Sequence, residues 1–318
     1  CSVFLYGWWQ PITIILFLQL QLFSFVLVNL SLFFLLFRKR MLLSAGRVNL
    51  FVVLRQIAPF GAIILLMGMH YRLDGFLLER LRPDGALQAG IYATAYRLLD
   101  AANMIGYLTA SFLVAFVARN RNDKPLLRSI LHLSLSGLLS VAIATSWFAL
   151  VFPTTIQKAL YHTADPLNDR VIQLCLAVLP AYYLIQVYGS ALTALAEFGV
   201  FIRILLSAVA VNIAFNFFLI PSDGAVGCCI AALISHYGCA IACYFAATKR
   251  LAFPRSVKPW VFFACAAVGL LLLLFLLKTT VHRVWIILAV SVLLLVIIVT
   301  QLKSIKTIVR LLIQQAHA

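Results

Sequence analysis

A series of long apolar segments constrains this chain more than any other feature. Nine segments come near or exceed the roughly 20 residues that a helix needs to cross the hydrocarbon of a bilayer. They are residues 11–37, 51–78, 88–117, 127–151, 171–196, 198–220, 224–247, 259–277 and 284–302. Their uniform length favours helices, because barrel strands would be runs of about 9–11 residues with alternating polarity. The sequence therefore predicts an all-α, polytopic helical membrane protein with about nine transmembrane helices.

Composition agrees with this class. The chain is 64% hydrophobic and 11% charged, whereas soluble domains are about 45–50% apolar and about 25% charged. A soluble core of this size would not hide so much apolar surface, so lipid has to be part of the solvent.

Basic residues lie mainly in the loops between the predicted spans, and these loops alternate between the two sides of the membrane. The loops and tail of one side hold 15 basic residues, and the loops of the other side hold six. The larger set is Arg38, Lys39, Arg40, Arg47, Arg119, Arg121, Lys124, Arg128, Lys249, Arg250, Arg255, Lys258, Lys303, Lys306 and Arg310. Cytoplasmic loops carry the excess of Lys and Arg, so this side is expected to be cytoplasmic, together with the C-terminus. The same distribution explains the net charge of +16 without a nucleic-acid partner.

The stretch from Tyr71 to Asp100 places charge inside this apolar sequence. Arg72, Asp74, Arg97 and Asp100 lie within or at the ends of spans. Such a residue at a helix centre costs about 2.5–3.5 kcal/mol on the insertion scale. We therefore expect these side chains to be shielded by protein or to face a water-filled cavity, and the hairpin to lie near a transport pathway.

The connections and proline positions give local expectations. Residues 153–170 predict the longest outside loop, and the Pro-Ser-Asp-Gly sequence at 221–224 predicts a tight reversal. Pro180 is expected to kink the 171–196 span. Four aromatic residues are expected either to stack on sugar rings or to anchor the protein at the membrane interface: Trp147, Tyr182, Tyr183 and Tyr188.

Motifs for covalent chemistry are absent from the sequence. It has seven cysteines but no Cys-x-x-Cys pair, nucleophile triad or P-loop. A metal site is therefore not expected, and neither is an ATP-driven pump within this chain. We interpret the protein as a non-enzyme.

Two runs resemble a known family. The first is D-G-F-L-L at 74–78, followed by A-G-I-Y-A-T-A-Y-R-L-L-D at 89–100. The second is N-I-A-F-N-F-F-L-I-P-S-D-G-A-V-G-C-C-I-A-A-L-I-S at 212–235. Both resemble motifs of polysaccharide (O-antigen type) flippases, which belong to the multidrug/oligosaccharidyl-lipid/polysaccharide exporter superfamily.

The resemblance implies two six-helix lobes that face each other across a central cavity, often with two extra C-terminal helices. On this chain, residues 51–250 would form one complete C-terminal lobe. Residues 251–318 would hold two extra helices and a basic cytoplasmic tail. Residues 1–50 would be the last helix of the first lobe and a linker, with five earlier spans missing. A cavity needs both lobes, so these residues alone are not expected to transport.

The function implied is the flipping of a lipid-linked oligosaccharide of the undecaprenyl-pyrophosphate type for surface polysaccharide and O-antigen synthesis. The substrate would move from the cytoplasmic to the outer leaflet of a bacterial inner membrane by alternating access. Implied partners are this lipid-linked substrate, membrane lipid, and a glycan polymerase with other proteins of its pathway. Two alternatives stay open: an ion-coupled multidrug antiporter of the same superfamily, and a glycan-pathway membrane enzyme such as a polymerase or ligase.

Charged residues of the spans are the substrate-binding candidates. The arginines are included because a guanidinium fork matches phosphate oxygens bidentately and the family implies cationic cavity residues. The candidates are Arg55, Arg72, Arg97 and Asp100. Alternatively, Arg72 pairs with Asp74 or snorkels to the interface, as Arg55 would. Asp100 would be either a proton carrier or the partner of Arg97, which lies three residues earlier on the same helix face.

Oxygen-bearing side chains make a second candidate site. Asn212 and Asn216 share a helix face at a spacing of four, and some superfamily members pair such residues with an acidic residue on the seventh helix. The resemblance therefore implies a cation site at Asp74, Asn212 and Asn216, for which oxygen ligands suit Na⁺. The alternative is that the Asn amides bridge neighbouring helices. No cofactor is expected, and Na⁺ or H⁺ coupling is left open.

Overall fold

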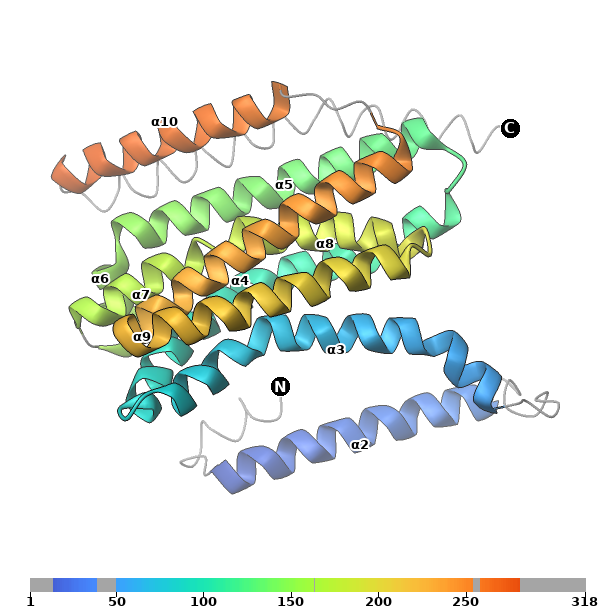
Figure 1. The fold of residues 1–318 in the computed structure, drawn as a ribbon, viewed down its shortest axis with the longest axis horizontal. Helices are drawn as coiled ribbons and strands as arrows, with labels where there is room; N and C mark the ends of the chain where they lie inside the picture. Colours follow the sequence, from blue (N-terminus) through green and yellow to red (C-terminus); the bar gives the residue numbers. More distant parts are fainter. Residues whose placement is uncertain (1–13, 39–49, 163, 254–257, 281–318) are drawn as a thin grey trace. The chain divides into compact units, whose positions relative to one another are not determined.

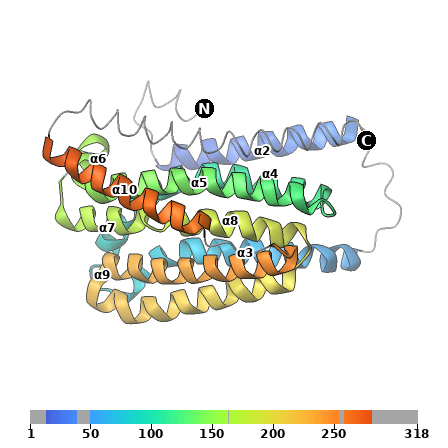
Figure 2. The same cartoon turned by 90° about the horizontal axis from the view of Figure 1, so that it is seen from above.

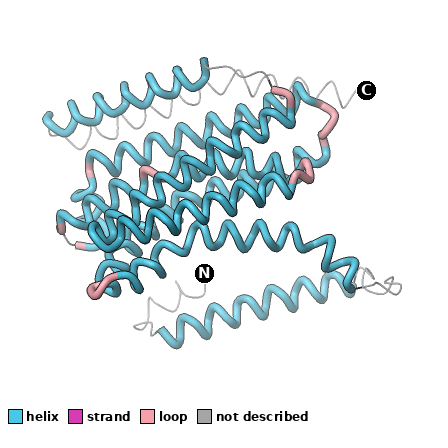
Figure 3. The backbone as a smooth tube through the Cα atoms, in the orientation of Figure 1, coloured by secondary structure: helices cyan, strands magenta, loops and turns pink. Residues whose placement is uncertain are grey.

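The computed structural model describes residues 14–38, 50–162, 164–253 and 258–280. The predicted span 284–302 and the basic tail therefore lie outside the described residues. The chain divides into two compact units, Cys1–Ile57 and Ala58–Ala318. Every regular element within the described residues is a helix (Figure 3).

The helices lie close to the predicted segments. Figures 1 and 2 show α2 (Ile14–Arg38), α3 (Leu50–Leu81), α4 (Gly85–Arg119), α5 (Lys124–Val151), α6 (Pro153–Tyr161), α7 (Pro166–Leu176), α8 (Leu179–Ala194), α9 (Phe198–Leu251) and α10 (Lys258–Thr280). Six helical stretches of the described chain are long and apolar enough to cross a membrane. Their lengths and composition are those of a multi-pass helical membrane protein.

Helix α8 is the centre of the second unit and packs against α4, α5 and α9. It is buried on every face, which explains why it lacks a polar stripe. Tyr182, Tyr183 and Tyr188 lie in this helix and are at most 7% exposed. Both predictions for these tyrosines are therefore wrong: they pack in the protein core instead of contacting sugar or the membrane interface.

The predicted 171–196 span is interrupted at Ala177–Val178, just before Pro180. Proline has no backbone N–H, so the carbonyl of Leu176 loses its helical donor. The Ser146 hydroxyl of α5 donates to that carbonyl at 2.7 Å. The Tyr237 hydroxyl of α9 donates to the carbonyl of Ala177 at 3.0 Å. Neighbouring helices thus satisfy the freed carbonyls, as a break inside a membrane requires.

Helix α9 is a helical hairpin with two arms. The chain stays helical through Pro221 and reverses at Gly224, where φ is +56° and ψ is −129°. This left-handed conformation favours glycine, and a Cβ there would lie 2.8 Å from Oε1 of Gln88. The tight reversal predicted at 221–224 is present, with its turning point at the glycine.

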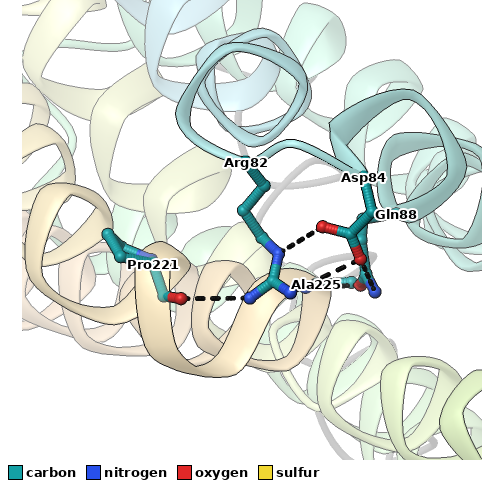
Figure 4. A network of polar contacts seen from close by, with 5 residues as sticks. All are labelled: Arg82, Asp84, Gln88, Pro221 and Ala225. Carbon is teal, nitrogen blue, oxygen red and sulfur yellow. Dashed lines mark hydrogen bonds and ion pairs between the residues drawn. The ribbon is translucent and has the colours of Figure 1, made fainter.

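Five residues join this reversal to the α3–α4 turn, and Figure 4 shows them. Arg82 donates to Asp84 at 2.6 Å and to the carbonyl of Pro221 at 3.1 Å. The Gln88 amide donates to Asp84 at 3.0 Å and accepts from the N–H of Ala225 at 3.1 Å. We call Arg82, Asp84, Gln88, Pro221 and Ala225 the turn latch. Gln88 thereby satisfies an N–H at the start of the second arm of α9, where helical partners are missing.

The predicted 153–170 loop is largely helical, contrary to expectation. It contains α6 and the start of α7, where Asp165 caps the helix by accepting from the N–H groups of Leu167 and Asn168. Prolines at the first turns of both helices explain why they begin where they do. Helix α10 packs against α5 through Leu270 and Leu274.

Candidate functional site

A pocket of about 200 Å³ opens between α3 and α4. Its lining combines two guanidinium groups, three phenol rings and small residues that leave the space open. The lining residues are Tyr71, Arg72, Gly75, Ala89, Tyr92, Ala93, Tyr96 and Arg97. All of them come from the hairpin that the sequence identified by its charge.

Arg72 forms an ion pair across this hairpin with Asp100. Its Nη2 lies 2.8 Å from Oδ2 of Asp100, and its guanidinium stacks over the Tyr96 ring at 4.9 Å. This contact corrects two expectations. Arg72 does not pair with Asp74, and Asp100 is the partner of Arg72 instead of Arg97. Sequence spacing favoured local pairs, whereas the hairpin brings together residues 28 positions apart.

Arg97 lines the pocket and has an exposed side chain. None of the ion pairs found within the described residues includes it. The pocket therefore holds one guanidinium with a carboxylate partner and one without. Arg55 is also exposed, but it belongs to the first compact unit. The structure thus brings together three of the four predicted substrate-binding residues: Arg72, Arg97 and Asp100.

Asp74 lies behind the pocket, 1% exposed, in a network of neutral donors. Its Oδ1 accepts from Asn216 at 2.8 Å, and its Oδ2 accepts from the Tyr92 hydroxyl at 3.3 Å. Asn216 also donates to Oδ1 of Asn212 at 3.0 Å. The three predicted cation-binding residues are therefore in contact in a single cluster.

Ser235 extends this cluster into the second arm of α9. Its hydroxyl accepts from Asn212 at 3.2 Å and lies 3.3 Å from Nε2 of His70. The Asn amides do bridge helices, as the alternative interpretation expected, yet Oδ1 of Asn216 is buried without a hydrogen-bond partner. An unpartnered acceptor beside a buried carboxylate is a place where a cation gains an oxygen ligand. We call Asp74, Asn212, Asn216, Ser235 and Tyr92 the carboxylate centre.

Sequence reasoning missed Ser235 and Tyr92. Ser235 was not singled out from the sequence, because nothing in its spacing from Asn212 predicts contact across the α9 hairpin. Tyr92 belongs to both sites, because its ring lines the pocket and its hydroxyl binds Asp74. The tyrosine-rich run at 92–96 was a signal that could have indicated it.

Two histidines pack beside the carboxylate centre. The rings of His70 and His236 stack with 3.8 Å between centroids and 6° between planes. Both side chains are at most 1% exposed. Tyr182 covers His236 at 4.7 Å between ring centroids. This aromatic group fastens α3 to α8 and to the second arm of α9.

Within the described residues, no group of three or more His, Cys, Asp or Glu side chains is arranged to hold a metal ion. Comparisons with models of known families, with curated proteins and with solved structures gave no match. The geometry of the pocket and the carboxylate centre therefore carries the functional argument.

Proposed function

We propose that this protein belongs to a transporter that flips an anionic, lipid-linked oligosaccharide across a bacterial inner membrane. The observation that carries this proposal is the pocket with Arg72 and Arg97 on membrane-length helices. Guanidinium groups bind phosphate and diphosphate oxygens in charge-assisted pairs. Keeping such groups in membrane helices costs free energy, so a function that needs positive charge explains their presence.

The aromatic part of the pocket suits the same substrate. Tyr71, Tyr92 and Tyr96 offer apolar rings beside the guanidinium groups. Each ring is only 5–7% exposed, so the three rings give the pocket an apolar wall of fixed position beside the cations that would hold the phosphate. A headgroup of this kind, diphosphate joined to sugar, is the chemistry that the sequence resemblance implies for the flippase family.

The carboxylate centre offers a route for ion coupling. Because Tyr92 contributes to both sites, a cation that draws the Asp74 carboxylate toward itself would also move a wall of the pocket. Occupation of one site would then bias the other, which is what coupling between two ligands requires. Either Na⁺ or H⁺ fits a buried carboxylate with neutral oxygen and amide neighbours.

The alternatives from the sequence are less well supported. A multidrug antiporter that exports cations would be favoured by an acidic cavity, yet the pocket-lining residues include two arginines and no carboxylate. A polymerase or ligase would be favoured by a large outside loop with paired basic residues. The segment at 153–170 instead folds into α6 and the start of α7.

The remaining features of the proposal follow from the flippase assignment. The protein would work in a two-lobed assembly by alternating access, with its C-terminus in the cytoplasm. It would act between the enzymes that build the lipid-linked unit and a polymerase that uses it. No chemical step on the substrate is part of this role.

Arg97→Ala tests the proposal. In cells that depend on this gene for surface glycan, we expect the variant to insert into the membrane normally. The variant loses the pocket's unpaired cation. Loss of a charge-assisted contact of about 1.5–3 kcal/mol weakens binding by about 10–100-fold. Surface glycan should therefore fall at least tenfold, and the lipid-linked precursor should accumulate. The measurements are membrane-fraction immunoblotting and quantification of surface glycan.

Arg203→Ala is the matched control. Arg203 is an exposed arginine in a membrane-length helix, and its guanidinium bonds the Gly199 carbonyl of its own helix. Export should continue in this variant. Undiminished export with Arg97→Ala would show that the pocket cation is not needed and would remove the main support for the proposal.

A further inference from the structure

A chain of hydrogen bonds runs from the carboxylate centre to the stacked histidines. Asn216 uses both hydrogens of its amide, one toward Oδ1 of Asp74 at 2.8 Å and one toward Oδ1 of Asn212 at 3.0 Å. Asn212 donates in turn to the Ser235 hydroxyl at 3.2 Å, and that hydroxyl lies 3.3 Å from Nε2 of His70. These five side chains are at most 1% exposed, so bulk water does not compete for their bonds.

The Ser235 hydroxyl has one hydrogen to donate, and three atoms lie close enough to be considered as its acceptor. They are the Ala232 carbonyl at 3.2 Å, Nε2 of His70 at 3.3 Å and Nδ1 of His236 at 3.4 Å. Nδ1 of His236 is excluded because it lies 2.8 Å from the Ala232 carbonyl, to which it has to donate its own hydrogen. The choice is therefore between the carbonyl and His70.

The Ala232 carbonyl has no lone pair left for the serine. It accepts from the ring of His236 and, as a helical carbonyl, from the backbone N–H four residues later, which also belongs to His236. A carbonyl oxygen has two lone pairs, so the Ser235 hydrogen goes to His70. The His70 ring is then neutral, with its hydrogen on Nδ1 and with Nε2 as the acceptor.

We propose that His70 is a positioning residue of the carboxylate centre, which accepts the Ser235 hydrogen and thereby keeps the side-chain oxygen of Asn216 open for a cation. The inference rests on the ion coupling in the proposed function and concerns how that site is made ready. With the serine hydrogen on His70, the serine lone pairs face Asn212, and the Asn212 oxygen faces Asn216. Oδ1 of Asn216 is then left without a hydrogen bond, as the described part of the chain shows.

Loss of the His70 acceptor would reverse the chain. The Ser235 hydrogen would turn to Asn212, whose amide would have to present its oxygen to the serine and its nitrogen to Asn216. The Asn216 oxygen would then accept from Asn212 and be used within the chain. Hard cations bind through side-chain oxygens, and an oxygen that already accepts a hydrogen bond offers less to them.

The stacking of the two histidines holds the acceptor in place. The rings of His70 and His236 lie 3.8 Å apart between centroids with 6° between planes. Tyr71 also packs against both rings. These contacts fix the ring plane in which Nε2 of His70 reaches Ser235. A phenylalanine at position 70 would keep the stacking and lose only the acceptor.

Sodium titration of the full 318-residue chain in detergent tests this role. The unfolding temperature is measured at increasing NaCl, with choline chloride keeping the ionic strength constant, and gives the Na⁺ concentration of half-maximal stabilisation. In His70→Phe this concentration should rise about tenfold, the equivalent of one hydrogen bond. A residue that only packed would lower the unfolding temperature without moving the half-maximal concentration, so an unmoved concentration would overturn the inference.

Two further variants make the result specific. His70→Gln carries an amide oxygen that can accept the serine hydrogen, so its half-maximal Na⁺ concentration should stay within about threefold of wild type. His132→Phe makes the same exchange as His70→Phe at an exposed position of α5 and should leave the concentration unchanged. An equal loss in His70→Gln and His70→Phe would show that the acceptor is not what matters and would also overturn the inference.

The His70 ring can be observed directly in wild type, without any need for His70→Phe to fold. Nitrogen NMR of protein with selectively labelled histidine distinguishes a ring nitrogen that carries a hydrogen from one that does not. The His70 signals are those that disappear in His70→Gln. They should show a hydrogen on Nδ1 and none on Nε2, because Nε2 accepts from Ser235. A hydrogen on Nε2 would contradict the proposed direction of the chain.

The remaining outcomes separate this inference from the proposed function. If wild type responds to Na⁺ and His70→Phe keeps the same half-maximal concentration, the role of His70 is wrong while the cation site stands. If wild type does not respond to Na⁺, the cation site is wrong and the role of His70 falls with it. Export through the arginine pocket is tested independently by Arg97→Ala.

Discussion

At the scale of single residues, polar side chains buried inside the helical bundle form hydrogen bonds with one another. Asp74 is enclosed by donors from Asn216 and Tyr92, and Asn212 reaches Ser235. Burying a carboxylate is costly unless hydrogen bonds compensate. These bonds compensate partly, and the unpartnered Oδ1 of Asn216 leaves room for one more interaction.

Sodium stabilisation of the protein should depend on Asp74. We expect 150 mM Na⁺ to raise the unfolding temperature of wild type by about 2–4 °C relative to choline, through preferential binding to the folded state. Asp74→Asn keeps the side-chain shape but loses the charge, so the sodium effect should vanish. Differential scanning fluorimetry in detergent measures it. Asp84→Asn should retain the effect, and an equal sodium response in Asp74→Asn would contradict the cation site.

Residue-level prediction from sequence agrees with the structure where the contact is local. The spacing of Asn212 and Asn216 predicts a shared helix face, and Asn216 donates to Asn212. Their grouping with Asp74 was implied by the family resemblance and not by spacing, and cation binding there stays a prediction. Prediction from sequence failed for Ser235, because a contact across a hairpin depends on where the turn lies and how its arms pack. It failed for the partner of Arg72 for the same reason, since no local period encodes the register between α3 and α4.

At the scale of elements, close approach between helices depends on glycine. Gly106 of α4 faces Tyr183 and Gln186 of α8, and an added Cβ would lie 2.7 Å from the Tyr183 ring. Tyr183 has little freedom to move, because its hydroxyl donates to the Ala102 carbonyl at 2.6 Å. Small residues at such crossings let backbones approach, which is the main packing device in membranes.

Gly106→Ala should therefore destabilise the protein by about 1–3 kcal/mol, the usual cost of overpacking. Gly90→Ala lies in the same helix, where nothing lies within 4 Å of an added Cβ. It should be neutral or stabilising by up to about 1 kcal/mol through helix propensity. Unfolding in mixed detergent with increasing SDS, followed by circular dichroism, gives both free energies. Equal stability for the two variants would show that the α4–α8 contact yields easily.

Element prediction from sequence was correct for a helical chain with long apolar helices, of which the described residues contain six of membrane length. The predicted count of about nine stays a prediction. Segment lengths identified the membrane helices that the structure describes, because hydrocarbon thickness sets the length of every span. A kink was expected at Pro180, and the structure has a break between α7 and α8 just before it, because the proline lacks the N–H that would bond to the preceding turn. The helices within 153–170 were missed, because polar composition alone had favoured a loop over capped short helices.

At the scale of the whole second unit, the turn latch joins segments about 140 residues apart, at one end of two helical hairpins. The neighbouring Arg82 guanidinium, and then the Gln88 amide, lower the pKa of the Asp84 carboxyl. The folded state therefore holds this proton less readily than the unfolded state does. Stability from the latch is fully present above the ordinary aspartate pKa of about 3.9 and is lost as the pH falls through the lowered pKa.

The acid sensitivity of the protein should consequently change in Asp84→Asn. We expect wild type to be more stable than the variant at pH 6, and the difference to shrink below about pH 4 as Asp84 takes up its proton. Unfolding temperatures measured in detergent from pH 6 to pH 2.5 give the two curves. Asp223→Asn removes the same charge from the α9 turn, where Asp223 bonds Ser222 and is not part of the latch. The difference in unfolding temperature between wild type and Asp223→Asn should therefore not shrink as the pH falls. Parallel curves for wild type and Asp84→Asn would mean that the charge of Asp84 in the turn latch does not contribute to the stability of the folded protein. Packing of α8 with its neighbours would then be what holds the two hairpins together.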